Sequence, residues 1–254
     1  MNRIVAIIPA RYASTRFPGK PLADIGGKSM IRRVYERVAA ASCVDEVWVA
    51  TDDLRILDHV RGWGGRVMMT SPEHQSGTER CAELAAKLDP MPEIIINVQG
   101  DEPFIQQAHL KSLVSCFDDP EVMIASLMKQ ISEPEELMSV HLPKVLVNRF
   151  QDALYFSRQP VPYVRDYLQS EWLYHHRFYK HIGIYAFRSH VLQELVQLPS
   201  TPLEQAEKLE QLRWLEHGYR IRMAITTADQ FSIDTPDDLQ RCLQMLDKLE
   251  RDVS

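Results

Sequence analysis

The chain lacks both glycine-rich motifs by which the best-known α/β proteins bind nucleotide phosphates. The dinucleotide fingerprint G-x-G-x-x-G would have to follow the first apolar run, residues 4–8, but only Gly19 precedes Gly26 there. Residues 27–29 have the G-K-S ending of a P-loop, but position 22, where that motif needs its first glycine, is leucine. These absences exclude an NAD-dependent dehydrogenase and a P-loop nucleotidase.

Other absences restrict the setting. No apolar run approaches the roughly 20 residues of a membrane span, and the first residues lead directly into a strand pattern without signal-peptide organisation. The four cysteines form no C-x-x-C pair, which is typical of a reduced cytoplasmic protein. A net charge of −6 and a pI near 5.9 argue against general nucleic-acid binding. We therefore expect a cytoplasmic protein with neither a membrane nor a nucleic-acid partner.

What is present is a β-α-β alternation. With 254 residues, 45% of them hydrophobic, the chain can form one sizeable core, and we expect a single domain over 1–254. The first half alternates strands at 4–8, 47–51, 66–70 and 93–98 with helices at 30–41, 54–62 and 77–88. The second half offers strands at 123–128, 144–147, 153–157, 182–187 and 220–225, helices at 203–217 and 235–251, and a long loop at 160–179. This order predicts an α/β fold with a mixed, mostly parallel sheet flanked by helices.

A basic loop follows the first strand. Between Arg11 and Lys28 there are four basic residues against one acid, on a chain that is acidic as a whole. The carboxyl end of a strand in an open α/β sheet is where ligands bind, and small residues there let backbone N–H groups approach a phosphate. Arginine can hold phosphate through two hydrogen bonds. The loop predicts a small phosphorylated ligand, with solvated surface charges as the alternative.

Two aspartates could complete such a site. The strand at 93–98 delivers Asp101 to the same edge of the sheet, where a carboxylate facing a cationic loop suits Mg²⁺ bound between protein and phosphate oxygens. A helix cap or surface turn is the alternative. Before the last helix, Thr235, Pro236 and Asp238 fit a capping box, which leaves Asp234 unexplained by capping. Asp234 is the second candidate metal ligand.

Four further features are candidates for binding a substrate. The turn at 74–80 opens a helix whose N-terminus could bind a base or phosphate, or is a plain N-cap by Ser76 or Thr78. On the helix at 203–217, one face carries Glu207, Glu210, Gln211 and Trp214, and this face could bind sugar hydroxyls or be a solvated face. Arg158 could hold a carboxylate, and His181 could donate to a substrate or be a structural histidine.

These segments together resemble one enzyme family. They are Ile-Pro-Ala-Arg-Tyr-Ala-Ser-Thr-Arg-Phe-Pro-Gly-Lys-Pro-Leu (8–22), Ser-Gly-Thr-Glu-Arg (76–80), Asn-Val-Gln-Gly-Asp-Glu-Pro (97–103), Ala-Leu-Tyr-Phe-Ser-Arg (153–158), His-Ile-Gly-Ile-Tyr (181–185), Glu-Lys-Leu-Glu-Gln-Leu-Arg (207–213) and Ile-Asp-Thr-Pro-Asp-Asp-Leu (233–239). In this order they are similar to the 3-deoxy-manno-octulosonate cytidylyltransferases, or CMP-Kdo synthetases. One departure is at 146–152, where the family usually carries an acid and then a glycine.

The resemblance implies a Rossmann-like nucleotide-diphospho-sugar transferase fold and a nucleotidyltransferase. Such an enzyme activates 3-deoxy-D-manno-octulosonate (Kdo) with CTP, giving CMP-Kdo and diphosphate for lipopolysaccharide biosynthesis, and is usually a cytoplasmic homodimer. Its implied catalytic residues are Arg11, Lys20 and Asp101, and its implied Mg²⁺ ligands are Asp101 and Asp234. Its implied nucleotide-binding residues are Ala10, Arg11, Ser14, Thr15, Arg16, Lys20, Ser76, Gly77 and Arg80. Its implied sugar-binding residues are Gln99, Arg158, His181, Tyr185, Glu210 and Gln211, and the region at about 144–190 would contribute to the sugar pocket and a dimer contact.

The sequence is also compatible with two alternatives. The first is a cytidylyltransferase for an amino-substituted octulosonate or another acidic sugar, which would share the chemistry and differ in contacts to the far end of the sugar. The second is a non-catalytic nucleotide sensor. A sensor would need neither Asp234 nor the sugar-binding residues, and their joint presence argues against it.

Overall fold

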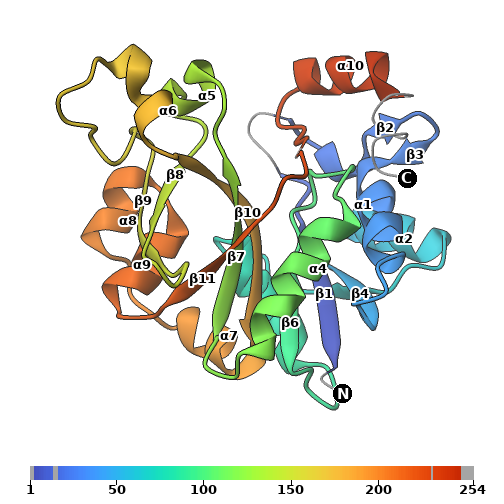
Figure 1. The fold of residues 1–254 in the computed structure, drawn as a ribbon. Helices are drawn as coiled ribbons and strands as arrows, with labels where there is room; N and C mark the ends of the chain where they lie inside the picture. Colours follow the sequence, from blue (N-terminus) through green and yellow to red (C-terminus); the bar gives the residue numbers. More distant parts are fainter. Residues whose placement is uncertain (1–2, 14–16, 230, 247–254) are drawn as a thin grey trace. The chain divides into compact units, whose positions relative to one another are not determined.

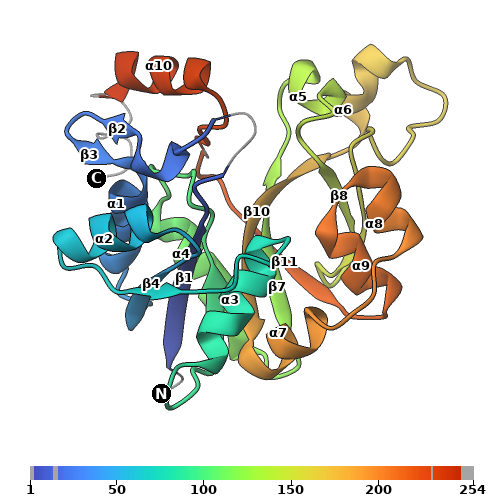
Figure 2. The same ribbon diagram turned by 180° about the vertical axis from the view of Figure 1, so that it is seen from behind.

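The computed structural model describes residues 3–13, 17–229 and 231–246. Its contacts divide the chain into two compact units, both shown in Figures 1 and 2. Unit 1 comprises Met1–Lys111, Ala186–Val196 and Asp229–Ser254, and unit 2 comprises Ser112–Tyr185 and Gln197–Ala228. The expected single domain stays a prediction.

The core of unit 1 is a parallel sheet. Its strands are β1 (Ile4–Ala10), β4 (Glu46–Thr51), β5 (Val67–Met69) and β6 (Ile94–Asn97), in the spatial order β6-β1-β4-β5. All three pairings are parallel. Residues 5–8 of β1 and all of β6 are buried, as expected of strands covered on both faces. The end of β10 (Tyr179–Arg188) lies beside β6.

Helices α1 (Met30–Ala39), α2 (Leu54–Gly62) and α3 (Gly77–Ala86) connect these strands. The chain runs outward from β1 through β4 to β5 and then returns to β6 on the other side of β1. Because such crossovers are right-handed, this reversal puts α3 on the opposite face from α1 and α2, and α3 faces the viewer in Figure 2. The reversal makes a switch point between the carboxyl ends of β1 and β6, where open α/β sheets bind ligands.

Smaller elements complete unit 1. They are the 3₁₀ turn η1 (Lys20–Leu22), the antiparallel pair β2 (Asp24–Ile25) and β3 (Lys28–Ser29), α7 (Ser189–Leu195) and α10 (Pro236–Gln244). In both views α10 lies next to β2 (Figures 1 and 2). Helix α4 (Gln107–Ser115) crosses from unit 1 into unit 2.

Unit 2 contains both pairing directions. Strand β11 (Ile221–Ile225) runs parallel to β7 (Ile124–Gln130), which neighbours β10. Strand β8 (Lys144–Val147) pairs antiparallel with β9 (Ala153–Ser157) and with β10. The helical elements are η2 (Cys116–Asp118), α5 (Pro134–Met138), η3 (Gln169–Glu171), α6 (Trp172–His175), α8 (Pro202–Glu207) and α9 (Glu210–Glu216). The mixed, mostly parallel sheet expected from the sequence is confirmed.

The expected single helix at 203–217 is wrong, because two helices occupy this region. Lys208 ends α8 in the left-handed conformation, at φ +53°, and α9 begins two residues later. The guanidinium of Arg158 donates to the carbonyls of Glu207 and Lys208 at this break, which satisfies backbone groups that a continuous helix would have used. Glu207 and Glu210 therefore do not share one helical face.

Two other regions differ in detail. The expected loop at 160–179 contains η3 and α6, whose Trp172 is buried against Phe178. At the departure from the family pattern, Asn148 Oδ1 accepts hydrogen bonds from two backbone N–H groups of the turn. Gln151 there adopts φ +65°, a conformation that favours glycine.

Candidate functional site

A cavity of about 260 Å³ opens at the switch point of unit 1. It lies where the chain leaves β1 and β6, with α3 and the segment before α10 also reaching its wall. The lining residues are Pro9, Ala10, Arg11, Lys20, Pro21, His74, Gln75, Ser76, Gly77, Arg80, Gln99, Gly100, Asp101 and Asp234. Nine of these were expected from the sequence, and all of them belong to unit 1.

Lys20 joins the two aspartates of the cavity. Its Nζ lies 2.7 Å from Asp101 Oδ2 and 3.4 Å from Asp234 Oδ1. The Lys20 side chain is 15% exposed, so these charges interact in surroundings drier than bulk water. The first loop therefore supplies a cation that is held between carboxylates from two other segments.

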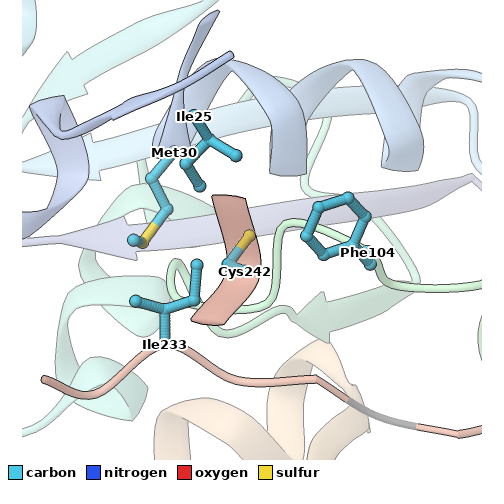
Figure 3. Packing of buried hydrophobic residues seen from close by; sticks show 5 residues of the cluster. All are labelled: Ile25, Met30, Phe104, Ile233 and Cys242. Carbon is cyan, nitrogen blue, oxygen red and sulfur yellow. The ribbon is translucent and has the colours of Figure 1, made fainter. Parts of the chain in front are cut away.

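One apolar cluster lies beneath the three segments that carry these charges. Figure 3 shows its buried members, Ile25, Met30, Phe104, Ile233 and Cys242. Phe104 follows Asp101, Ile233 precedes Asp234, and the partly buried Phe17 packs on the same cluster. The N–H of Ile233 also donates to the Asp101 carbonyl at 2.9 Å. Packing therefore fixes the spacing of the aspartates before any ligand binds.

Capping holds Asp234 at the start of α10. Thr235 is the N-cap, and its side chain and that of Asp238 form the expected capping box. Asp238 Oδ2 also accepts from the N–H of Asp234 at 3.1 Å. Burial alone would raise the pKa of Asp238, but hydrogen bonds from Thr235 and Arg241 lower it below its usual range. The sequence interpretation of this segment is confirmed as far as its capping is concerned.

Glycines shape the cavity floor. A Cβ on Gly100 would lie 3.0 Å from the carbonyl oxygen of Pro9, and a Cβ on Gly77 would lie 3.0 Å from the Pro9 ring. Gly19, at φ +73°, donates its N–H to the Tyr12 carbonyl at 3.0 Å and so brings together the two ends of the basic loop. Close backbone approach of this kind leaves room for a phosphate chain.

Helix α3 begins at the cavity. Ser76 is its N-cap, and its hydroxyl accepts from the N–H of Glu79. Arg80 is buried, and its guanidinium donates to Thr70 Oγ1, the Ser71 carbonyl and Asp52 Oδ2. Arg80 therefore lines the cavity while supporting its wall.

The carboxylates suit a divalent cation. Among the residues the structure describes, no group of three or more His, Cys, Asp or Glu side chains is arranged to hold a metal. Mg²⁺ does not need such a cage, because it commonly binds one or two carboxylates together with substrate phosphates and water. Asp101 and Asp234, which already share one cationic neighbour in Lys20, fit this pattern.

Known proteins match this chain over nearly its whole length. The profile of a family described as Cytidylyltransferase matches residues 5–223. The 3-deoxy-manno-octulosonate cytidylyltransferase of Parabacteroides distasonis is 50% identical over 250 residues, covering 97% of this chain and 99% of that protein. Its namesake from Cytophaga hutchinsonii is 53% identical over 239 residues, covering 94% and 95%. A solved structure of CMP:2-keto-3-deoxy-manno-octonic acid synthetase complexed with CTP has a TM-score of 0.90 and 44% identity, covering 97% of this chain and 99% of that one.

This chain belongs to the 3-deoxy-manno-octulosonate cytidylyltransferase family. The family, the enzyme class and the nucleotide-diphospho-sugar transferase fold expected from the sequence are confirmed. Of the loop residues that the family pattern assigns to the nucleotide, Ala10, Arg11 and Lys20 line the cavity. Ser14, Thr15 and Arg16 lie outside the described residues.

The residues that the family pattern assigns to the sugar lie in both units. Gln99 lines the cavity of unit 1. Unit 2 contains Arg158, His181, Tyr185, Glu210 and Gln211. The Tyr185 ring lies 5.3 Å from that of His181 and 5.1 Å from that of Trp214. Burial, reinforced by the Glu210 carboxylate, raises the pKa of Tyr185 well above its usual value, so this phenol stays protonated.

His181 is held as a neutral imidazole. Its Nε2 lies 2.9 Å from Ser126 Oγ, whose hydroxyl can donate to the Ile184 carbonyl at 2.9 Å. This pattern makes Nε2 the donor and leaves Nδ1 as the acceptor. Desolvation among the rings of Phe156 and Tyr185 lowers the pKa of His181 to about 3.

The guanidinium of Arg158 donates to backbone carbonyls, in addition to the carboxylate-binding role expected from the family pattern. Its Nε, Nη1 and Nη2 donate to the carbonyls of Glu207, Val140 and Lys208 at 2.7, 3.0 and 3.4 Å. Its own carbonyl accepts from Nζ of Lys144, a fully buried lysine that sequence patterns missed. Burial lowers the pKa of Lys144 to about 8, although the Glu207 carboxylate opposes the shift. The carboxylate clamp expected of Arg158 stays a prediction.

Proposed function

We propose that this chain transfers CMP from CTP to the anomeric hydroxyl of Kdo and releases diphosphate. One observation carries the proposal: the cavity at the switch point brings together Arg11, Lys20, Asp101 and Asp234, in a chain half identical to curated 3-deoxy-manno-octulosonate cytidylyltransferases. A structural neighbour of 44% identity was solved with CTP, which supports CTP as the nucleotide.

Positioning and charge neutralisation are the main tasks of such a site. Both the triphosphate and the acidic sugar are anionic, so bringing them together requires fixed cations and alignment more than a strong base. Arg11 lines the cavity and is exposed to an incoming ligand. The Lys20 ammonium has three donors and can hold a phosphate oxygen as well as a carboxylate. Both side chains would stabilise charge on the departing diphosphate.

We infer that the enzyme uses Mg²⁺ held by Asp101 and Asp234. When bound, the ion would neutralise phosphate charge and make a coordinated hydroxyl more acidic. The two carboxylates would hold it on the side of the cavity where Lys20 already shows that a cation is stable. Gln99 lines the same cavity and can donate or accept hydrogen bonds with sugar hydroxyls.

We further propose that the enzyme is a cytoplasmic homodimer that supplies lipopolysaccharide biosynthesis. Residues Tyr163, Leu168 and Tyr174 of unit 2 are 75, 73 and 85% exposed, and large apolar groups gathered on one segment favour a protein contact. Sedimentation of the wild type against Leu168→Glu tests the dimer. All four cysteines are free, as expected in a reducing compartment, and cell fractionation tests the location.

A diphosphate-release assay over nucleotides and acidic sugars tests the activity. We expect release only when CTP, Kdo and Mg²⁺ are present together. Diphosphate release from CTP at the same rate without sugar would contradict the proposal. A higher kcat/KM for an amino-substituted octulosonate than for Kdo would keep the chemistry and change the substrate.

A further inference from the structure

The loop 70–76, whose residues His74, Gln75 and Ser76 line the cavity, is held by side chains of the helix that follows it. Glu83 Oε2 accepts from the N–H of Ser71 at 2.7 Å and lies 2.6 Å from His74 Nε2. Arg80 Nη1 donates to the Ser71 carbonyl at 3.2 Å, so the N–H and the C=O of Ser71 are both hydrogen-bonded to side chains of α3. The loop therefore lies along the helix through defined contacts.

A second carboxylate acts on the same loop one helical turn earlier. Glu79 Oε2 accepts from the N–H of Gln75 at 2.7 Å and lies 3.6 Å from His74 Nδ1. Residues four apart on a helix share a face, so Glu79 and Glu83 flank the His74 ring from both ends. His74 is thereby oriented on the wall of the cavity.

The two oxygens of Glu83 have different partners. Oε2 bonds the loop, whereas Oε1 bonds Nζ of Lys87, whose side chain is 49% exposed. Burial would raise the pKa of Glu83, but hydrogen bonds from Lys87, Ser71 and His74 lower it to about 2. Glu83 is therefore ionised throughout the working pH range, and its bonds to the loop are charge-assisted.

The loop is well placed to distinguish nucleobases. His74, Gln75 and Ser76 line the cavity. Cytosine presents an amino donor where uracil presents a carbonyl acceptor, so polar groups at fixed positions favour one base over the other. A site built to hydrogen-bond one pattern rejects the other because its polar groups would be left unpaired.

We propose that Glu83 is a positioning residue that fixes loop 70–76 so that the cavity binds CTP in preference to UTP. The inference rests on the proposed function, because it assumes that this cavity binds the nucleotide. Glu83 acts through Ser71 and His74 and does not itself line the cavity. Its effect is thus expected in KM for the nucleotide and in base preference, with kcat preserved.

Steady-state kinetics of Glu83→Ala and Glu83→Gln test whether Glu83 sets the preference for CTP. We expect KM for CTP to rise about tenfold in Glu83→Ala and less in Glu83→Gln, whose amide oxygen can still accept one bond. The preference for CTP over UTP, as a ratio of kcat/KM, should fall by a similar factor. At saturating CTP, kcat and KM for the sugar should stay within about twofold of wild type.

Lys87→Ala is the matched control, because it removes the other partner of Glu83 and leaves the loop contacts in place. It should keep the wild-type KM and base preference. Wild-type values in both Glu83 variants would overturn the inference, as would an equal rise in KM in Lys87→Ala. If Glu83→Ala does not fold, the KM for CTP and the base preference of Glu83→Gln test the inference on their own. A wild-type enzyme that fails to use CTP would instead overturn the proposed function.

Discussion

The ammonium group of Lys20 lies 2.7 Å from Oδ2 of Asp101, although 81 residues separate the two in sequence. Lys20 comes from the loop after β1, and Asp101 follows β6, which is paired directly with β1. The neighbouring strand ends therefore bring a cation and an anion together at the switch point. This edge of the sheet holds a cationic and an anionic side chain in one place, charges that suit a polyphosphate and a divalent cation, respectively.

Replacing Asp101 by Asn should remove most turnover and preserve the fold. The substitution keeps the shape of the side chain and removes the charge that faces Lys20 and that would bind Mg²⁺. We expect kcat to fall by about 100-fold or more, measured as diphosphate release at saturating substrates. Asp58→Asn, on the exposed face of α2, is the control and should behave as wild type. Near wild-type turnover of Asp101→Asn at saturating Mg²⁺ would show that Asp101 is not a ligand.

Replacing Lys20 by Ala should make stability depend on Mg²⁺. Without the ammonium, Asp101 and Asp234 lose a shared cationic neighbour, and a divalent cation should take its place. A ligand present at 100 times its Kd stabilises the folded state by about 2.7 kcal/mol. We therefore expect Mg²⁺ to raise the Tm of Lys20→Ala by on the order of 5 °C more than that of wild type, measured by differential scanning fluorimetry. Equal shifts in both proteins would mean that Lys20 and the metal occupy separate places.

Much of this site could be predicted because its signals are local. A strand that ends in a basic loop, and another that ends in Gly100 and Asp101, identify the sheet edge once parallel pairing is assumed. The capping box explains Thr235 and Asp238 but not Asp234, whose carboxylate is therefore available for another role. These inferences need only the order of elements and the chemistry of chain ends.

The parts that were missed depend on contacts between distant segments. The break between α8 and α9 has no glycine or proline at Lys208, and Arg158, 50 residues away, supplies donors to the exposed carbonyls. Lys144 looks like an ordinary strand lysine in sequence, yet it is fully buried, and its ammonium group donates hydrogen bonds to two backbone carbonyls. Glu83 looks like a solvated helix residue until the return of Ser71 onto α3 is known.

Gly100→Ala should impair the site by displacing the backbone that carries it. The added methyl group would lie 3.0 Å from the Pro9 carbonyl oxygen and 3.6 Å from Ile8 Cγ2, so the chain after β6 must shift away from β1. We expect a loss of stability of about 1–3 kcal/mol in chemical denaturation and a rise in KM for CTP. Gly62→Ala is the control, since a Cβ there meets no atom within 4 Å. Equal stability and equal KM for CTP in the two variants would show that the site tolerates a side chain at Gly100 despite its close approach to the Pro9 carbonyl.

The state of His181 should make unfolding depend on pH. Its pKa is lowered to about 3 in the folded chain, against about 6.5 when unfolded, so the unfolded state binds more protons between these values. Stability from this group is therefore complete above about pH 7 and is lost as pH falls toward 3. Because His181 as a residue is only partly buried, we expect a loss of about 1–2 kcal/mol between pH 7 and 4.5.

Urea unfolding of wild type and His181→Gln across that range measures this contribution. The difference in unfolding free energy between the two proteins should shrink as pH falls, because Gln does not titrate. His190→Gln, which removes an exposed histidine, is the matched control in the same series. A constant difference between wild type and His181→Gln from pH 7 to 4.5 would mean that the imidazole of His181 accepts a proton inside the folded chain as readily as in water. The packing of His181 against Phe156 and Tyr185 would then have no effect on the pKa of its imidazole.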